Sequence, residues 1–167
     1  MDMKIKIVEL SKEIYAPFGQ FVSSPTHKPT IEADIVKYWA NLAGFSVDGT
    51  IDVGWVTMRK RPMVLTQLER HFQTVEVAIP LDDVMVLPVA VGREPFDYKS
   101  QPRSDDIQGF YLRPGQMVTY APGTWHFGGF PLNKPEASFL VLTRRGTADT
   151  DVSMQSISEI SQIEFIQ

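Results

Sequence analysis

The residues best suited to chemistry in this chain are two histidines and the glutamates near one of them. Glu69 stands two positions before His71, and Glu76 stands five positions after it. His126 ends the segment APGTWH, in which a Pro-Gly turn can aim the following side chain inward. Two imidazoles and two carboxylates form the nitrogen and oxygen ligand set that suits a divalent first-row metal. We therefore predict four residues that are both catalytic and metal-binding: Glu69, His71, Glu76 and His126.

A strand is the element that can position Glu69 and His71 together. Residues two apart on a strand project from the same face, so these two side chains are expected to point the same way and Arg70 the opposite way. Glu76 is an odd number of positions from His71 and would face away on a continuous strand. A turn at residues 72–73 could bring the next strand back and return Glu76 to the same interior.

Each of these residues also has a purely structural interpretation. His71 and His126 could be buried and hydrogen-bonded within the protein, and Glu76 could be exposed to water on a half-buried strand. His27 lies in a polar, proline-flanked stretch typical of a surface loop, and no functional role is predicted for it. Buried carboxylates are costly unless they are paired or bind a metal, so both glutamates need a partner if they lie inside.

Substrate contacts are predicted for Arg59, Trp125 and Arg144. A guanidinium matches a carboxylate with two parallel hydrogen bonds, so either arginine could hold an acidic substrate. Arg59 also belongs to a run of basic residues that could simply be solvated at a strand end. Trp125 could form the wall of a pocket beside His126, or it could belong to the core.

Short strands joined by turns are the elements expected to carry these residues. Twelve prolines and eleven glycines interrupt the sequence, which favours many strands over long helices. The expected strands are residues 4–10, 51–60, 65–71, 75–79, 84–91, 109–112, 117–120 and 138–143. This pattern is typical of a closed β-barrel or β-sandwich, and we expect one domain over residues 1–167.

A few short helices are compatible with this all-β class. Residues 11–15 can form a helical turn capped by a serine, and residues near 156–162 can form another. Residues 31–45 fit neither the helical nor the strand period well. No stretch of the sequence approaches the length of a membrane-spanning helix.

Composition limits the range of partners. The net charge of −4 disfavours binding to nucleic acid, which needs a clustered basic surface. The chain has no cysteine, which excludes disulfides, thiolate metal sites and a cysteine nucleophile. We expect a cytoplasmic protein with no membrane partner that binds a small carboxylate-bearing substrate and forms a homodimer.

The spacing of the two histidine segments resembles the cupin superfamily. Its first motif has two histidines one residue apart and a glutamate four or five positions later, and its second ends in Pro-x-Gly-x-x-His, from which Pro122 departs by standing one place later. Here Glu69 replaces the first histidine, His71 and Glu76 match the rest, and residues 123–126 match the second motif. The resemblance implies a cupin-type double-stranded β-helix, or jelly-roll barrel.

A closer resemblance is to the ureidoglycolate lyase family, which has the cupin fold. It rests on Arg59-x-x-Pro62 leading to Glu-Arg-His at residues 69–71, on Ile-Pro at 79–80, and on Trp-His at 125–126. Weaker similarities extend from Pro-Phe-Gly at residues 17–19 to Asp-Val at 151–152. The resemblance implies cleavage of ureidoglycolate to glyoxylate and urea in allantoin breakdown, with a divalent metal such as nickel, zinc or manganese.

The chain departs from the pattern of this family at several positions. Glu76 stands where family members carry glutamine, Phe127 replaces a second histidine, and Thr143 replaces an aspartate. Two alternatives to the lyase therefore remain. One is a cupin that binds a small carboxylate or sugar without catalysis, which Phe127 and Thr143 favour. The other is a different metal-dependent cupin enzyme, such as an isomerase or dioxygenase, which Glu76 favours.

Overall fold

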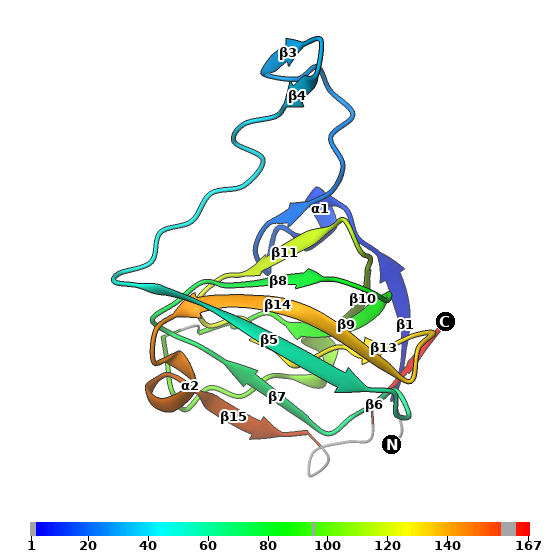
Figure 1. Cartoon of the computed structure of the whole chain (residues 1–167). Helices are drawn as coiled ribbons and strands as arrows, with labels where there is room; N and C mark the ends of the chain where they lie inside the picture. The colour runs from blue at the N-terminus through cyan, green and yellow to red at the C-terminus, as the bar shows by residue number, and fades with distance from the viewer. Residues whose placement is uncertain (1–2, 95, 158–162) are drawn as a thin grey trace.

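The computed structural model describes residues 3–94, 96–157 and 163–167, and its main body consists of two facing β-sheets (Figure 1). The larger sheet has the strand order β15-β7-β12-β9-β10-β1-β16-β6, with β13 also paired to β9. Its strands are β1 (Met3–Glu9), β6 (Val64–Leu65), β7 (Gln67–Arg70), β9 (Met85–Ala90), β10 (Ile107–Leu112), β12 (Trp125–His126), β13 (Phe130–Pro131), β15 (Ser153–Ser156) and β16 (Ile163–Ile166). Within it, β1 runs parallel to both β10 and β16.

The smaller sheet has five strands in the order β2-β11-β8-β14-β5. They are β2 (Phe21–Val22), β5 (Ile51–Arg59), β8 (Glu76–Pro80), β11 (Met117–Tyr120) and β14 (Glu136–Arg144). Every neighbouring pair in this sheet is antiparallel. The two sheets confirm the predicted all-β, cupin-type barrel.

The predicted strands are found close to their expected positions, and residues 117–120 match β11 at both ends. The expected strand at 65–71 is instead divided into β6 and β7. Between them, Thr66 is exposed and its carbonyl accepts a hydrogen bond from the amide of Ile157. The short strands β2, β12, β13, β15 and β16 were not predicted, because two to four residues show too little alternation to be recognised.

The few helices are short. Helix α1 (Lys12–Tyr15) begins after Ser11, whose hydroxyl accepts a hydrogen bond from the amide of Ile14, as predicted. Helix α2 (Thr147–Thr150) and the 3₁₀ turn η1 (Ser104–Asp106) complete the set among the described residues. A helix was also expected near residues 156–162. Ser156 is instead the last residue of strand β15, and residues 158–162 lie outside the described residues. No described helix has the length and apolar character needed to span a bilayer.

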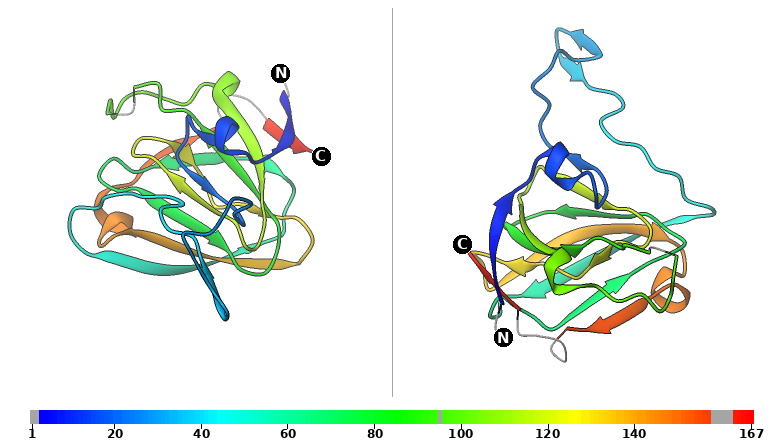
Figure 2. Two further views of the ribbon diagram at one scale, coloured as in Figure 1. Left: turned by 90° about the horizontal axis from the view of Figure 1, so that it is seen from above. Right: turned by 180° about the vertical axis from the view of Figure 1, so that it is seen from behind.

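Residues 31–45, which fit neither period, contain a hairpin of β3 (Ile31–Ala33) and β4 (Val36–Tyr38). These strands pair only with each other. Figures 1 and 2 show the hairpin standing clear of the two sheets at the end of two long connecting segments.

Apolar side chains bury both faces of the larger sheet. All six residues of β9 are buried because the strand alternates between two core clusters. Met85, Leu87 and Val89 point into the first cluster, between the sheets, where they meet Phe110. Val86 and Ala90 point into the second cluster on the other face. A strand buried on both faces explains why the sequence there is almost uniformly apolar.

Candidate functional site

The interior between the two sheets contains a pair of cavities that meet at the same carboxylates. One cavity, of about 220 Å³, is lined mainly by apolar side chains, including Val56, Met58, Leu87, Phe127, Phe139 and Val141. The other, of about 350 Å³, is lined by His71 together with Thr143, Thr147, Val152 and Met154. Glu69 and Glu76 line both cavities.

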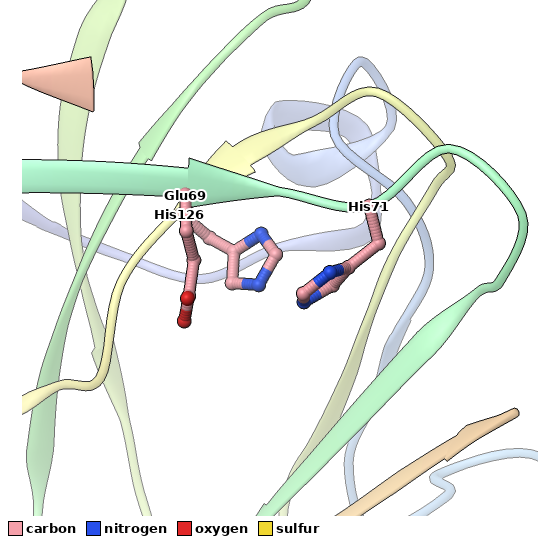
Figure 3. A group of neighbouring side chains, drawn as sticks. All are labelled: Glu69, His71 and His126. Atoms are coloured by element: carbon pink, nitrogen blue, oxygen red, sulfur yellow. The ribbon is translucent and has the colours of Figure 1, made fainter. Parts of the chain in front are cut away.

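The larger sheet brings His71, His126 and Glu69 together. In the sheet register Glu69 of β7 is directly opposite His126 of β12, and His71 follows β7 by one residue. One ligand atom from each of the three side chains lies within 4.8 Å of the other two. Figure 3 shows all three side chains projecting toward the same space. The alternation of β7 turns Arg70 to the other face, where it is fully buried.

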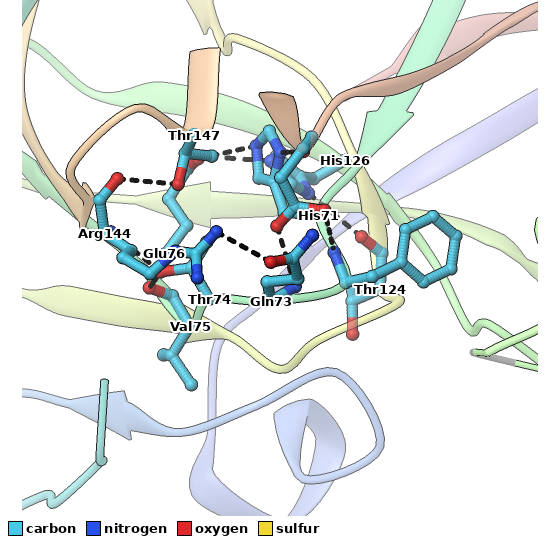
Figure 4. Close-up of polar contacts among 11 residues, drawn as sticks. His71, Gln73, Thr74, Val75, Glu76, Thr124, His126, Arg144 and Thr147 are labelled. Atoms are coloured by element: carbon cyan, nitrogen blue, oxygen red, sulfur yellow. Dashed lines mark hydrogen bonds and ion pairs between the residues drawn. The ribbon is translucent and has the colours of Figure 1, made fainter. Parts of the chain in front are cut away.

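Glu76 reaches this group from the opposite sheet. The turn after His71 carries the chain across to β8, the first residue of which is Glu76. Its Oε2 lies 3.1 Å from His71 Nε2, and its Oε1 lies 3.5 Å from His126 Nε2. The predicted return of Glu76 to the interior therefore occurs, although β8 belongs to the facing sheet and not to the sheet of β7. Figure 4 shows these contacts.

The charges of Glu76, His71 and His126 depend on one another. Burial raises the pKa of the Glu76 carboxyl, but His126 and His71 outweigh burial and lower that pKa to about 2. Burial lowers the pKa of His71, while its hydrogen bond and charge interaction with Glu76 raise it above the ordinary value. Glu76 is therefore an anion at neutral pH, and its charge favours the protonated form of His71.

Backbone carbonyls orient both imidazoles. His71 Nδ1 lies 2.6 Å from the carbonyl oxygen of Asp151, and His126 Nδ1 lies 3.0 Å from that of Thr124. A carbonyl can only accept, so each Nδ1 must carry the hydrogen. The Nε2 atoms are then the ones directed at the carboxylates, which is the usual orientation of a metal-binding imidazole.

Asp151 was not predicted as part of the site, although it holds the turn that carries His71. Its two carboxylate oxygens accept hydrogen bonds from the amides of Phe72 and Gln73, at 2.9 and 2.7 Å. Asp151 is buried and lies 80 positions beyond His71. The sequence marked it only as part of a family similarity, since no spacing rule links residues so far apart.

Tyr120 was also missed. Its ring stacks on the imidazole of His126 with the centroids 4.2 Å apart, and the residue lines the apolar cavity. Burial raises the pKa of its phenol well above 10, with smaller contributions from Glu76 and Glu69. The hydroxyl therefore remains protonated at neutral pH and can act as a hydrogen-bond donor.

The donor set fits a divalent metal ion. His126 Nε2 is buried, and within the described part of the chain it has no hydrogen-bond partner. Its 3.5 Å separation from Glu76 is within range for charge attraction but too long for a good hydrogen bond. A buried nitrogen without a partner, beside a second imidazole and a carboxylate, is what a first-row metal would satisfy.

The predicted substrate-binding residues do not line the two cavities. Arg59 is exposed and forms an ion pair with Glu136, with 3.0 Å between Nε and Oε1. Trp125 is in the core beyond the sheet, where the guanidinium of Arg70 stacks on its ring. Arg144 lies next to the cavity residue Thr143, and its Nη2 donates to Gln73. Their substrate-binding roles remain predictions.

The residues that depart from the family pattern face the cavities. Phe127 lines the apolar cavity, Thr143 lines the second, and Glu76 lines both. No lysine or arginine is among the described residues that line either cavity. The substitutions therefore change the chemistry of the pocket directly.

Comparison with solved structures matches about two thirds of this chain to parts of larger proteins. An S161A mutant of Bacillus subtilis oxalate decarboxylase OxdC matches with a TM-score of 0.44 and 15% identity, over 67% of this chain and 25% of that one. Vicilin from Corylus avellana (hazelnut) matches with a TM-score of 0.44 and 8% identity, over 64% and 26%. The present chain thus spans about a quarter of either protein.

Sequence comparison covers nearly the whole chain. The family model described as ureidoglycolate lyase matches residues 2–164. A protein named ureidoglycolate lyase from Chelativorans sp. (strain BNC1) is 30% identical over 154 residues, which cover 86% of this chain and 86% of that protein. The chain therefore belongs to the ureidoglycolate lyase family.

Proposed function

We propose that this protein cleaves ureidoglycolate into glyoxylate and urea. Family membership over residues 2–164 supports the reaction. The observation that carries the proposal is the convergence of Glu69, His71 and His126 beside a cavity, with Glu76 facing them from the other sheet. An interior cluster of ionisable groups that opens on a cavity is the usual signature of a catalytic site.

The reaction requires one proton to move. The substrate carries a hydroxyl, a carboxylate and a ureido nitrogen on the same carbon. Removal of the hydroxyl proton allows the carbon–oxygen double bond to form as the carbon–nitrogen bond breaks. The departing nitrogen then takes up a proton, so that urea and the glyoxylate anion are released with all atoms balanced.

Glu76 is the group we assign to this proton transfer. Its low pKa, about 2, keeps it ionised at neutral pH, and so weak a base could take the hydroxyl proton only from a hydroxyl that a bound metal has made more acidic. Once protonated it is a strong acid, so it can return the same proton to the departing nitrogen. It is also placed at the junction of the two cavities, in reach of a substrate that occupies either.

Glu69, His71 and His126 are the residues that would hold a divalent metal, and Glu76 is near enough to join them. Such an ion, when bound, polarises the hydroxyl and carboxylate oxygens of the substrate. The fixed Nδ1 hydrogen bonds keep both imidazoles turned toward this position. We propose nickel, zinc or manganese as the metals to test.

The substrate carboxylate needs a counter-charge that the described cavity walls lack. Arg144 is the arginine best placed to supply it, because its guanidinium donates to Gln73, two residues after His71. Its Nε is buried and has no hydrogen-bond partner among the described residues. Rotation of this side chain away from Gln73 would free a guanidinium for the substrate.

Urea release from ureidoglycolate is the direct test. We expect the purified protein to release urea and glyoxylate in equal amounts, and His126→Ala to lose at least about a hundredfold in turnover because it removes one metal ligand. Bound metal should be measured on the same samples. His27→Ala is the matched control, since His27 is outside both cavities described here.

Normal metal content and normal turnover in His126→Ala would show that the assignment is wrong. Absence of turnover in the wild-type protein under every one of the three metals would overturn the proposed reaction itself.

A further inference from the structure

We infer that the apolar cavity beside Glu76 is a subsite for the leaving group of the substrate, and that the protein cleaves N-acyl-α-hydroxyglycines with an apolar acyl group the size of a benzoyl group. These compounds have the same reacting carbon as ureidoglycolate, but an apolar group replaces the terminal amino group of the urea. The inference rests on the proposed function for the type of reaction, and on the lining and volume of the cavity for the substrate class.

The cavity is walled by apolar side chains from both sheets. Val56 of β5 and Phe139 of β14 are directly opposite each other in the register of these neighbouring strands (Figure 1), and both line the cavity from the smaller sheet. Leu87 of β9 lines it from the larger sheet. All three belong to the core cluster between the sheets or pack against it. The walls are therefore held in place by the core of the protein.

One end of this cavity meets the carboxylates of the proposed site. Glu69 and Glu76 line both it and the second cavity. The reacting carbon is expected beside Glu76, the group assigned to the proton transfer. The second cavity has hydrogen-bonding side chains on its wall, those of His71, Thr143 and Thr147, and suits the substrate carboxylate. The group on the nitrogen is then left to extend into the apolar cavity.

The terminal amino group of ureidoglycolate is a poor match for that cavity. It carries N–H donors, and a buried donor without an acceptor costs free energy. Among the described residues that line the cavity, only Glu69, Glu76 and Tyr120 have a side-chain oxygen. The two carboxylates are at the junction of the cavities, so the wall beyond them offers one side-chain oxygen, that of the phenol. An apolar group has no donor to satisfy and removes apolar walls from water.

The phenol of Tyr120 suits the carbonyl of the leaving group. Burial raises the pKa of this hydroxyl, so it is protonated at neutral pH and can donate a hydrogen bond. The carbonyl next to the nitrogen is common to ureidoglycolate and to the N-acyl compounds, so a bond from Tyr120 does not discriminate between them. The apolar walls decide which of the two classes binds better.

The volume of the cavity sets the size of the acyl group. It is about 220 Å³, and an apolar cavity of about 150 Å³ is enough to hold benzene. The thioether of Met58, which lines the cavity, packs so closely on Gly128 that a Cβ built there would lie 2.9 Å from its Sδ. A flexible methionine lets this wall adapt to the shape of the bound group. A benzoyl group therefore fits.

Cleavage of such a substrate balances in the same way as the proposed reaction. The hydroxyl O–H bond breaks and the carbon–oxygen double bond forms as the carbon–nitrogen bond breaks. The departing nitrogen takes up the proton, so the products are the glyoxylate anion and a primary amide in place of urea. No oxidant, reductant or further reactant is required.

Rates on matched substrates test the inference. The value of kcat/KM for glyoxylate release is measured with N-benzoyl-α-hydroxyglycine, N-acetyl-α-hydroxyglycine and ureidoglycolate on one preparation of the full chain. The acetyl and carbamoyl groups have similar size, so this pair isolates the effect of the amino group. We expect the benzoyl compound to exceed the acetyl compound by at least about tenfold, since even one methylene in an apolar pocket can have that effect. No advantage of benzoyl over acetyl would overturn the inference.

Filling the cavity should remove this preference. Val56→Phe is expected to lower the ratio of kcat/KM for the benzoyl compound to that for ureidoglycolate by at least about tenfold. Val53→Phe is the matched control, because Val53 has the opposite parity on the same strand and is 65% exposed. It should leave the ratio unchanged. Val56→Ala is a milder change to the fold, and by enlarging the cavity it should raise the rate on the bulkier N-naphthoyl compound relative to the benzoyl compound.

Binding of analogues without the hydroxyl separates this inference from the proposed function. N-benzoylglycine and N-carbamoylglycine cannot be cleaved by this route, and calorimetry should show at least about tenfold tighter binding of the benzoyl analogue to the wild type than to Val56→Phe. That result without turnover of any hydroxy compound would overturn the proposed reaction and keep the subsite. Turnover of ureidoglycolate, with benzoyl and carbamoyl analogues bound equally by the wild type, would overturn the subsite and keep the reaction.

Discussion

Glu76 is the residue on which the charge state of the site depends. It faces two imidazoles at 3.1 and 3.5 Å and is nearly buried, so its carboxylate is stabilised by neighbours and not by water. Where the family pattern has glutamine, this chain therefore carries a negative charge at neutral pH. That charge is what keeps the pKa of His71 raised.

The metal-free protein should lose stability in acid through this residue. A carboxyl with a pKa of about 2 in the folded state and 4.5 as its ordinary value favours folding above pH 4.5, and the benefit disappears as the pH falls toward 2. At 1.36 kcal/mol per unit of pKa the benefit is on the order of 3 kcal/mol. Urea unfolding from pH 6 to pH 2 should show this acid decline, and Glu76→Gln should flatten it.

His71 contributes with the opposite sign. Its raised pKa favours folding below the ordinary value of 6.5, and this part is lost as the pH rises through the raised pKa. Glu76→Gln should remove this alkaline decline as well. An unchanged pH profile in Glu76→Gln would contradict the coupling of these groups.

Asp151 should act on the site by positioning His71. Asp151→Ala removes the acceptor for two backbone amides in the turn that carries His71. We expect metal affinity to fall about 10- to 100-fold, as for other residues that support metal ligands. KM should change little relative to kcat, because Asp151 is not among the residues that line the two cavities beside Glu76.

The conservative variant separates positioning from general destabilisation. Asp151→Asn keeps one carbonyl oxygen as acceptor and should recover part of the metal affinity. Equal metal affinity in Asp151→Ala and the wild type, measured by competition with a chelating dye, would refute the positioning role.

At the scale of elements, the site depends on how the N-terminal segment packs on β11. Gly19 precedes β2, and a Cβ built there would lie 1.9 Å from the carbonyl oxygen of Thr119. Thr119 cannot move away easily, because its amide donates to the carbonyl of Gln20 and its hydroxyl accepts from the amide of Gln20. Tyr120, which stacks on His126, is the next residue of the same strand.

We therefore expect Gly19→Ala to destabilise the protein by about 1–3 kcal/mol, the usual cost of overpacking. Gly44→Ala is the matched control, because nothing lies within 4 Å of a Cβ at that position. It should change the free energy of unfolding by less than about 0.5 kcal/mol. Denaturant unfolding of both variants at one protein concentration checks this, and equal stabilities would show that the close approach is not a constraint.

Strand alternation predicted some elements of the site and not others. It placed Glu69 with His71 and turned Arg70 away, because the two-residue period applies wherever a strand is long enough. It could not show that Glu76 crosses to the opposite sheet, since a turn at residues 72–73 is compatible with either connection. The two-residue strand β12, which carries His126, is too short to have a period at all.

For the whole molecule, the barrel could be predicted and its surface could not. Turn residues and short apolar runs indicated an all-β domain, and the two histidine segments indicated where its interior site would lie. The hairpin of β3 and β4 gave no such signal, because its exposed isoleucines, Ile31 and Ile35, resemble core residues in sequence. Charge type alone likewise could not reveal that Arg59 is paired with Glu136 at the surface.

The proposed metal ligands come from parts of the chain separated by more than fifty positions, and they meet only across the paired strands β7 and β12. In a partly folded barrel, Glu69 and His71 are not yet joined by His126. A divalent cation would therefore bind only weakly to this intermediate and stabilise it little. Cation availability in the cell should consequently govern how long the finished protein survives, while leaving the speed of its assembly unaltered.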